Sequence, residues 1–151
     1  MKKKTWIGLL LSFLLLCSCN DGVEIKQDYD FNLSSWYLQK QVEMGETVEI
    51  RFYLTREGDY DKARYELGYI QMDGKGEVFD SEGTHLINRE VIPLDAVPDL
   101  DTTNPKKQVF TLFYRSTSTK RSELKFFLRD NFNQEREMNV TFDVQSGSSE
   151  Q

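Results

Sequence analysis

Two cysteines, Cys17 and Cys19, stand in the most chemically specific setting of this chain. They follow three lysines at positions 2–4 and an apolar run at 6–16, which is the arrangement of an export signal. A leucine three places before Cys19 and a small serine directly before it match the cleavage site of a lipoprotein signal peptidase. That enzyme cuts before a cysteine whose sulfur carries a diacylglyceryl group. Because the bulky Leu16 directly precedes Cys17, we predict cleavage before Cys19 and lipidation of its sulfur.

The apolar run is too short to be a membrane span. It has 11 residues, whereas a bilayer core of roughly 30 Å needs about 20. An ordinary secretory signal would fit the charged and apolar parts equally well. The position of Cys19 favours a lipoprotein signal instead. We therefore expect a signal peptide over 1–18, a lipidated tether over 19–22 and a location in the cell envelope, with the outer membrane as the expected membrane.

The mature chain is acidic and has no disulfide to stabilise it. Removal of residues 1–18 takes away three lysines and no acidic residue, so the formal net charge falls from −6 to −9. Such a surface repels phosphate backbones, and we expect no nucleic-acid partner. Cys17 leaves with the signal and Cys19 is lipidated. The domain must then rely on a hydrophobic core, for which aromatic residues make up 13% of the chain.

The sequence contains few of the residues and motifs that are typical of catalytic sites. His85 is the only histidine, no G-x-S-x-G nucleophile motif occurs, and the cysteine and histidine count excludes a zinc site of that type. Carboxylate pairs could serve a glycosidase, but 25 acidic residues make some close pair inevitable. We expect His85 to be an exposed loop residue, and we predict that the protein is not an enzyme and needs no cofactor.

Two other groups of side chains could bind a ligand. Asp95, Asp99 and Asp101 cluster in one segment and carry the hard oxygen ligands that Ca²⁺ prefers, although their spacing is not that of an EF-hand. We expect a solvated acidic loop there and no metal site, with calcium as the alternative left open. Tyr37, Tyr53 and Phe127 fall on the outer faces of predicted strands, where aromatic rings could form a binding platform or be covered by a loop.

The elements that carry these residues are short β-strands, because apolar and polar residues alternate with a period of two. The clearest runs are 48–54, 110–114, 124–128 and 138–144, and weaker candidates are 23–31, 36–42, 64–72, 77–79 and 90–92. Glycine, aspartate and asparagine turns separate the runs. This pattern predicts an all-β fold, namely an immunoglobulin-like antiparallel sandwich of about seven strands, with a small barrel as the alternative.

The sandwich is expected to cover residues 23–144, followed by a flexible Ser/Gly-rich tail over 145–151. All three prolines lie within 93–107. We expect that segment to be an exposed loop or a poorly hydrogen-bonded edge.

The C-terminal part of the chain reads L-K-F-F-L-R-D-N-F-N-Q over 124–134, followed by the strand pattern at 138–144. It looks like the last hairpin of many bacterial immunoglobulin-like domains. Together with 65–76 and 113–116, it resembles the TraQ-type lipoproteins encoded in the transfer regions of Bacteroidetes conjugative transposons. The resemblance implies an immunoglobulin-like fold and a place among conjugation proteins, and it implies no catalytic residue. For such a source, Asp101-Thr102-Thr103 also resembles an acceptor site for protein O-glycosylation.

These observations favour a lipid-anchored, non-enzymatic interaction module of the cell envelope that serves conjugative transfer of a mobile element. Its expected partners are the membrane, through the lipid, and other envelope or conjugation proteins. The alternative is a surface lipoprotein that binds a glycan or another ligand by stacking on Tyr37, Tyr53 or Phe127.

Overall fold

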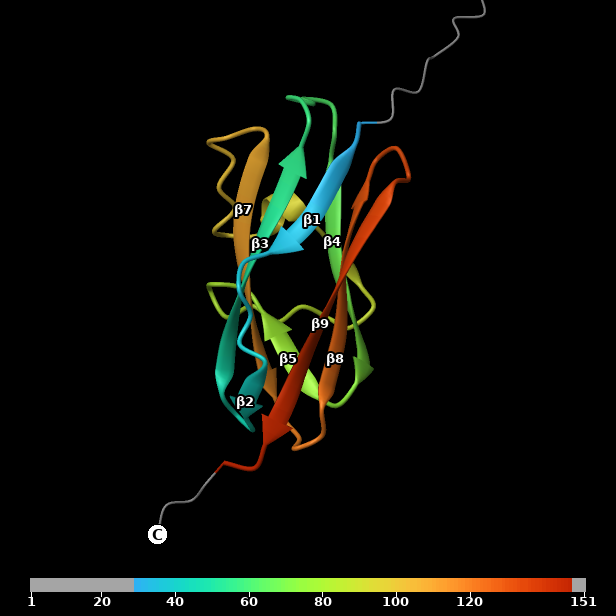
Figure 1. Cartoon of the computed structure of the whole chain (residues 1–151). Helices are drawn as coiled ribbons and strands as arrows, with labels where there is room; N and C mark the ends of the chain where they lie inside the picture. Colours follow the sequence, from blue (N-terminus) through green and yellow to red (C-terminus); the bar gives the residue numbers. More distant parts are fainter. Residues whose placement is uncertain (1–28, 148–151) are drawn as a thin grey trace, which may run out of the picture.

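A computed structural model of the chain describes residues 29–147, which form two β-sheets packed face to face (Figure 1). Apart from one short 3₁₀ helix, η2 (Leu94–Ala96), the regular elements of this part are strands. The strands are β1 (Phe31–Ser35), β2 (Gln41–Glu43), β3 (Thr47–Arg56), β4 (Tyr65–Asp73), β5 (Gly76–Phe79), β6 (Val91–Pro93), β7 (Lys107–Ser116), β8 (Ser122–Asp130) and β9 (Glu135–Gln145). One sheet has the order β1-β3-β7-β5 and the other β2-β9-β8-β4-β6.

The two strand orders are those of an immunoglobulin-like sandwich. The first sheet corresponds to strands A, B, E and D of that fold, and β9, β8 and β4 correspond to G, F and C. The predicted sandwich is therefore confirmed. Residues 29–147 contain nine strands where about seven were expected, and the additional two, β2 and β6, are three-residue strands at the sheet edges. β2 also pairs in parallel with β9, whereas the other pairs are antiparallel.

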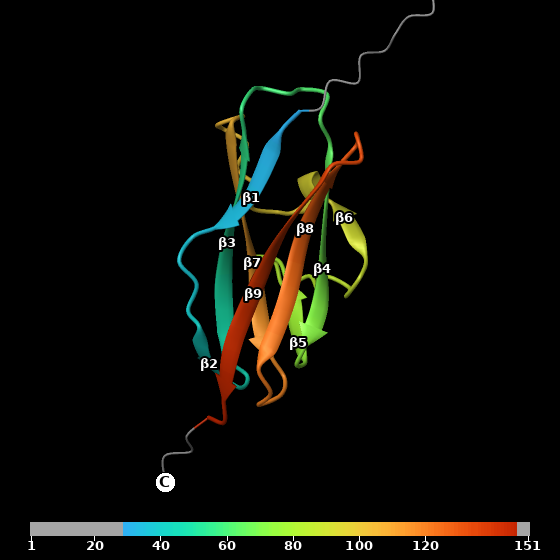
Figure 2. The same cartoon turned by 45° about the vertical axis from the view of Figure 1, so that its right-hand side comes forward.

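The period-two runs form the strands because one face of each run is buried between the sheets. On β3, the side chains of Val48, Ile50, Phe52 and Leu54 are buried, while Glu49 and Arg51 between them are exposed. β7 and β8 contribute Phe110, Leu112, Leu124 and Phe126 to the same core. Figure 2 shows the two layers from the side, with β6 at the outer edge of the second sheet.

Stacked aromatic rings join the two sheets through the core. The Phe52 ring stacks on that of Phe110, with centroids 5.0 Å apart, and meets Phe126 of the opposite sheet edge-on at 4.9 Å. Tyr114 stacks on Phe142 across the core at 5.1 Å. The Tyr114 hydroxyl donates a 2.7 Å hydrogen bond to Oγ of Ser122, so this fully buried phenol has a polar partner.

The proline segment is more ordered than a simple exposed loop. β6 pairs with β4, η2 follows directly, and Asp101 forms an antiparallel bridge to Val109 beside β7. Leu94 and Val97 are buried in the core and fasten the segment to the sandwich. The expectation of an exposed loop was wrong at these two residues, since apolar side chains spaced three apart on a helical turn can both face inward.

Several predictions concern residues outside the described range. The signal peptide 1–18, Cys19 and the tether 19–22 lie there, as do 148–151 of the predicted tail. Within 29–147, no helix is long and apolar enough to cross a bilayer. The described chain enters the sandwich at one end, where β1 begins, and leaves it at the opposite end, where β9 finishes (Figure 1). The domain limits 23–144 stay a prediction.

Candidate interaction surface

The two outer faces of the sandwich differ in chemistry. The face formed by β9, β8 and β4 carries cross-strand ion pairs, with Lys125 Nζ 3.0 Å from Glu137 Oε2 and Arg129 Nη2 2.9 Å from Glu135 Oε2. Opposite charges on neighbouring strands satisfy one another and keep that face hydrated.

The outer face of the β1-β3-β7-β5 sheet is aromatic, and we call it the aromatic face. The rings of Phe79 and Phe113 stack there with centroids 5.7 Å apart. The Tyr53 ring lies beneath Lys107, whose Nζ is 4.5 Å from the ring centroid. Basic side chains above aromatic rings form cation–π contacts while their charges stay in water. This face therefore offers flat rings together with polar groups.

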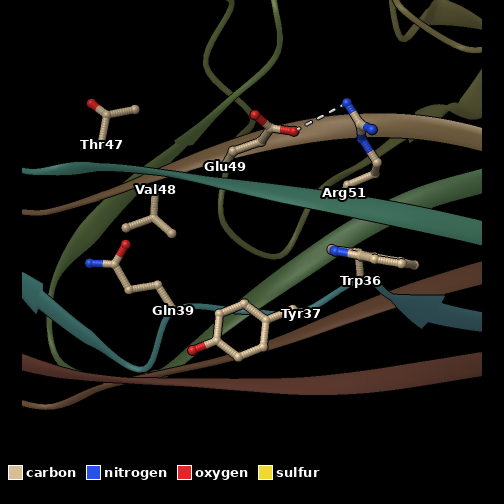
Figure 3. A pocket seen from close by; sticks show the side chains of 7 residues that line it. All are labelled: Trp36, Tyr37, Gln39, Thr47, Val48, Glu49 and Arg51. Carbon is tan, nitrogen blue, oxygen red and sulfur yellow. Dashed lines mark ion pairs between the residues drawn. The ribbon is translucent and has the colours of Figure 1, made fainter.

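An open hollow of about 380 Å³ lies at the edge of the aromatic face, and Figure 3 shows the side chains around it. We call it the Trp36 hollow, and it is lined by Trp36, Tyr37, Gln39, Thr47, Val48, Glu49 and Arg51. Trp36 is 67% exposed and Tyr37 is 85% exposed. Two adjacent large rings left in water are unusual, because burying either ring would stabilise the fold by about 1.5–3 kcal/mol.

The chain direction explains why these rings are exposed. Residues 36–40 carry the chain from β1 in one sheet to β2 in the other. Leu38 of this segment packs against the core, whereas Trp36 and Tyr37 face solvent. The backbone N–H of Trp36 donates to the carbonyl of Arg51 on β3 at 3.1 Å. At the other end, Nε2 of Gln39 donates to Gln41 O at 2.7 Å and to Glu46 Oε1 at 3.1 Å. The crossing is thus held in place at both ends while its rings face solvent.

Charges around the hollow are balanced by local pairs. Arg51 Nη2 lies 3.5 Å from Glu49 Oε1 on the same strand (Figure 3). Further along the aromatic face, the guanidinium of Arg115 hydrogen-bonds Glu77 at 2.8 Å and lowers the pKa of that carboxyl. The described lining of the hollow holds no histidine or cysteine. Its arrangement is suited to stacking and hydrogen bonding.

Of the three aromatic residues predicted from sequence, Tyr37 lines the hollow and Tyr53 contacts Trp36 of its lining. Tyr53 meets Trp36 edge-on at 6.5 Å, and Tyr37 follows Trp36 in the hollow. Phe127 lies on the outer face of the other sheet and is only 7% exposed. It therefore cannot share one platform with the tyrosines. Sequence reasoning missed Trp36, although two consecutive aromatic residues after Ser34-Ser35 break the period of two and cannot both face a core.

The carboxylates of the acidic segment accept hydrogen bonds from backbone N–H groups. Asp99 Oδ1 accepts a 3.2 Å hydrogen bond from the Thr111 N–H, and Asp101 Oδ1 accepts one of 2.9 Å from the Thr103 N–H. Hydrogen bonds from the Thr103 side chain and backbone lower the pKa of the Asp101 carboxyl. Within 29–147, no group of three or more His, Cys, Asp or Glu side chains could hold a metal ion. The structure thus gives no support to the calcium alternative at Asp95, Asp99 and Asp101.

The remaining candidate residues are exposed. His85 lies on the surface, with its ring 5.6 Å from that of Phe79. The three residues Asp101-Thr102-Thr103 are also exposed, and glycosylation of this segment stays a prediction.

Comparisons with known proteins show which family this chain resembles. The family model described as TraQ conjugal transfer protein matches residues 4–145. A solved conjugative transposon lipoprotein from Bacteroides eggerthii is 25% identical, covers 77% of this chain and 99% of its own, and has a TM-score of 0.63. A lipoprotein from Bacteroides thetaiotaomicron is 31% identical over 85% of this chain and 90% of its own, with a TM-score of 0.61. No curated protein matches the chain.

A third solved structure, a conjugate transposon protein from Bacteroides vulgatus, is 25% identical over 86% of this chain and 97% of its own, with a TM-score of 0.62. These matches confirm the resemblance noted in the sequence and support a role in conjugative transfer. Because two of the similar proteins are described as lipoproteins, they also support an envelope location. The chain belongs to the TraQ conjugal transfer protein family.

Proposed function

We propose that this protein is a lipid-anchored, non-enzymatic interaction module of the cell envelope that assists conjugative transfer of a mobile element. Lipidation of Cys19 would attach it to the outer membrane. Ten peptide units separate Cys19 from Tyr29, so the anchor would hold the sandwich within roughly 35 Å of that membrane. The acidic mature chain would contact envelope or conjugation components rather than nucleic acid.

The observation that carries the proposal is the exposure of Trp36 and Tyr37, which are adjacent and are the two most exposed large hydrophobic side chains of the described residues. Large exposed rings beside polar groups are typical of a binding surface. The lining of the Trp36 hollow offers no nucleophile held by a base, which favours binding over catalysis. Glu49 and Arg51 are instead paired with each other.

The anchor is tested by replacing its acceptor. We expect Cys19→Ala to abolish metabolic labelling with a fatty-acid analogue and to release the protein from the outer-membrane fraction. Cys17→Ala is the matched control, and it should label and fractionate like the unchanged protein. Labelling that persists in Cys19→Ala would overturn the anchor assignment.

The role of the Trp36 hollow is tested by measuring the frequency of conjugative transfer. A strain that lacks the gene is complemented with the unchanged protein, with a Trp36→Ala/Tyr37→Ala double variant or with a Lys125→Ala/Glu137→Ala double variant on the opposite face. We expect transfer frequency to fall about tenfold or more with the aromatic variant, a loss that corresponds to about 1.4 kcal/mol of binding. The control pair should transfer normally at equal protein level. Normal transfer by the aromatic variant would argue against this surface.

A further inference from the structure

We infer that the Trp36 hollow binds a neutral saccharide, so that the envelope component contacted by this protein is a glycan. This inference rests on the proposed function, because it names the ligand class of the same surface. It follows from four features of the hollow: the exposed rings, the polar side chains around them, the balanced charge of the lining and the open shape.

The rings provide stacking surfaces. A sugar ring has an apolar face of C–H groups, which packs on an aromatic ring, and a periphery of hydroxyl groups. Trp36 and Tyr37 are consecutive, are both more than half exposed and line the same hollow. The Tyr37 ring lies between Trp36 and Gln39 in the view of Figure 3.

Planar polar side chains surround the rings. Glu49 provides a carboxylate, Arg51 a guanidinium, and their side chains are each about half exposed, at 53% and 54%. Such groups present two parallel acceptors or donors, a geometry that matches neighbouring hydroxyl groups. Gln39 also lines the hollow, and its Nε2 is held in place by hydrogen bonds to Gln41 O and Glu46 Oε1, so its Oε1 can serve as an acceptor.

The charge balance points to a neutral ligand. Glu49 and Arg51 form an ion pair 3.5 Å apart, so the hollow carries no net charge from its lining. A phosphate or carboxylate group would have to compete with Glu49 for the guanidinium, and a cation would have to compete with Arg51. Hydroxyl groups can bond to both side chains without breaking the pair.

The shape argues against an apolar peptide as the occupant. Val48 is the aliphatic residue of the lining. Its side chain is buried in the core, so it offers an apolar peptide little exposed surface to pack on. The hollow is open, and its volume of about 380 Å³ is at the small end of ligand sites, which span about 300–1,000 Å³. A short saccharide segment uses flat rings in an open site, whereas an apolar side chain needs an enclosed pocket.

The test uses a spectroscopic property of this sequence. The chain has two tryptophans, Trp6 and Trp36, and Trp6 lies in the predicted signal peptide. All nine strands lie within 31–145, so a chain beginning at Asn20 contains the whole sandwich and has Trp36 as its single tryptophan. Its fluorescence therefore reports directly on the hollow.

The probes are tetrasaccharides of β-1,4-linked glucose, α-1,6-linked mannose and β-1,4-linked N-acetylglucosamine, titrated to 10 mM. We expect at least one of them to shift and saturate the Trp36 emission. Tyr37→Ala should weaken that apparent Kd about tenfold or more, the loss of one stacking contact. Met72→Ala, which alters an exposed apolar residue of the other sheet, should change it less than about twofold. A matching shift of backbone NMR signals at 36–39 and 47–51 would place the sugar in the hollow.

The absence of saturable binding by all three tetrasaccharides would overturn the inference. So would binding that Tyr37→Ala leaves unchanged, because the sugar would then lie elsewhere. Either result leaves the proposed function standing if the Trp36→Ala/Tyr37→Ala variant still loses transfer, and the hollow would then be a protein interface. Normal transfer by that variant contradicts the proposed function independently of any sugar binding.

Discussion

The guanidinium of Arg56 donates two hydrogen bonds, from Nε and Nη2, to the carbonyl oxygen of Pro105, which lies 49 residues away, and the Nε bond is 2.7 Å long. The arginine side chain is only 5% exposed and lies over the rings of Tyr60 and Tyr65. Nη1 also reaches the Tyr60 carbonyl at 3.3 Å. One buried cation thereby ties the end of β3 to the loop before β7.

Replacement of Arg56 should destabilise the sandwich strongly. Arg56→Met keeps much of the apolar stem but leaves the Pro105 and Tyr60 carbonyls without their donor. We expect a loss of about 2–4 kcal/mol in the free energy of unfolding, measured by urea denaturation. Arg51→Met, at an exposed site on the same strand, should cost less than about 0.5 kcal/mol. Equal stability of the two variants would contradict the role assigned to Arg56.

Gly76 is required by the close approach of the Tyr114 ring. A Cβ added at Gly76 would overlap that ring, which is fully buried and hydrogen-bonded to Ser122. We expect Gly76→Ala to cost about 1–3 kcal/mol or more, as overpacked cores do. Gly147→Ala is the control, since its Cβ would lie 3.6 Å from Glu43 Oε2, an ordinary contact. Thermal denaturation of both variants tests the difference, and an unchanged Tm for Gly76→Ala would refute it.

Stability should fall in acid because of surface ion pairs. Hydrogen bonding to Arg115 lowers the pKa of Glu77 below its ordinary value of 4.5, and hydrogen bonding to Lys120 lowers that of Asp73 below 3.8. A lowered pKa in the folded state means that the stabilisation is present above the ordinary pKa and is lost as the pH falls through the folded value. The free energy of unfolding, measured from pH 6 downward, should therefore begin to decrease near the ordinary pKa values of 4.5 and 3.8 and should continue to decrease below them. Glu77→Gln should reduce the slope, and an unaltered slope would count against the Arg115 contact.

Tyr37 should matter little for folding. Because its side chain is 85% exposed, we expect Tyr37→Ala to change the free energy of unfolding by less than about 0.5 kcal/mol. Phe126→Ala, in the core, should cost about 3–5 kcal/mol. Urea denaturation of the two variants separates a surface residue from a packing residue. A large loss in Tyr37→Ala would mean that the exposed ring serves the fold, and the transfer test would then need another variant.

The sequence determined the class of fold because side-chain alternation is a local property of a strand. The runs at 48–54 and 138–144 predict buried and exposed faces without knowledge of any partner, and the structure places β3 and β9 there. The predicted lipoprotein signal and the family resemblance likewise rest on the order of residues along the chain. The three-residue strands β2 and β6 were weaker in the sequence, since so few residues cannot establish a period.

Only the tertiary structure decided which outward aromatic residues meet water. Tyr53 and Phe127 both lie at outward positions, and the linear pattern cannot separate them. The register pairs Phe127 with Gly68, where a Cβ would come within 2.9 Å of Cε1 of the phenylalanine ring and 3.0 Å of the Glu90 carbonyl. The absence of a side chain at Gly68 leaves room for the Phe127 ring, which is buried against its own sheet. Trp36 and Tyr37 stay exposed because their segment crosses between the sheets, a position that depends on strand pairs far apart in the chain.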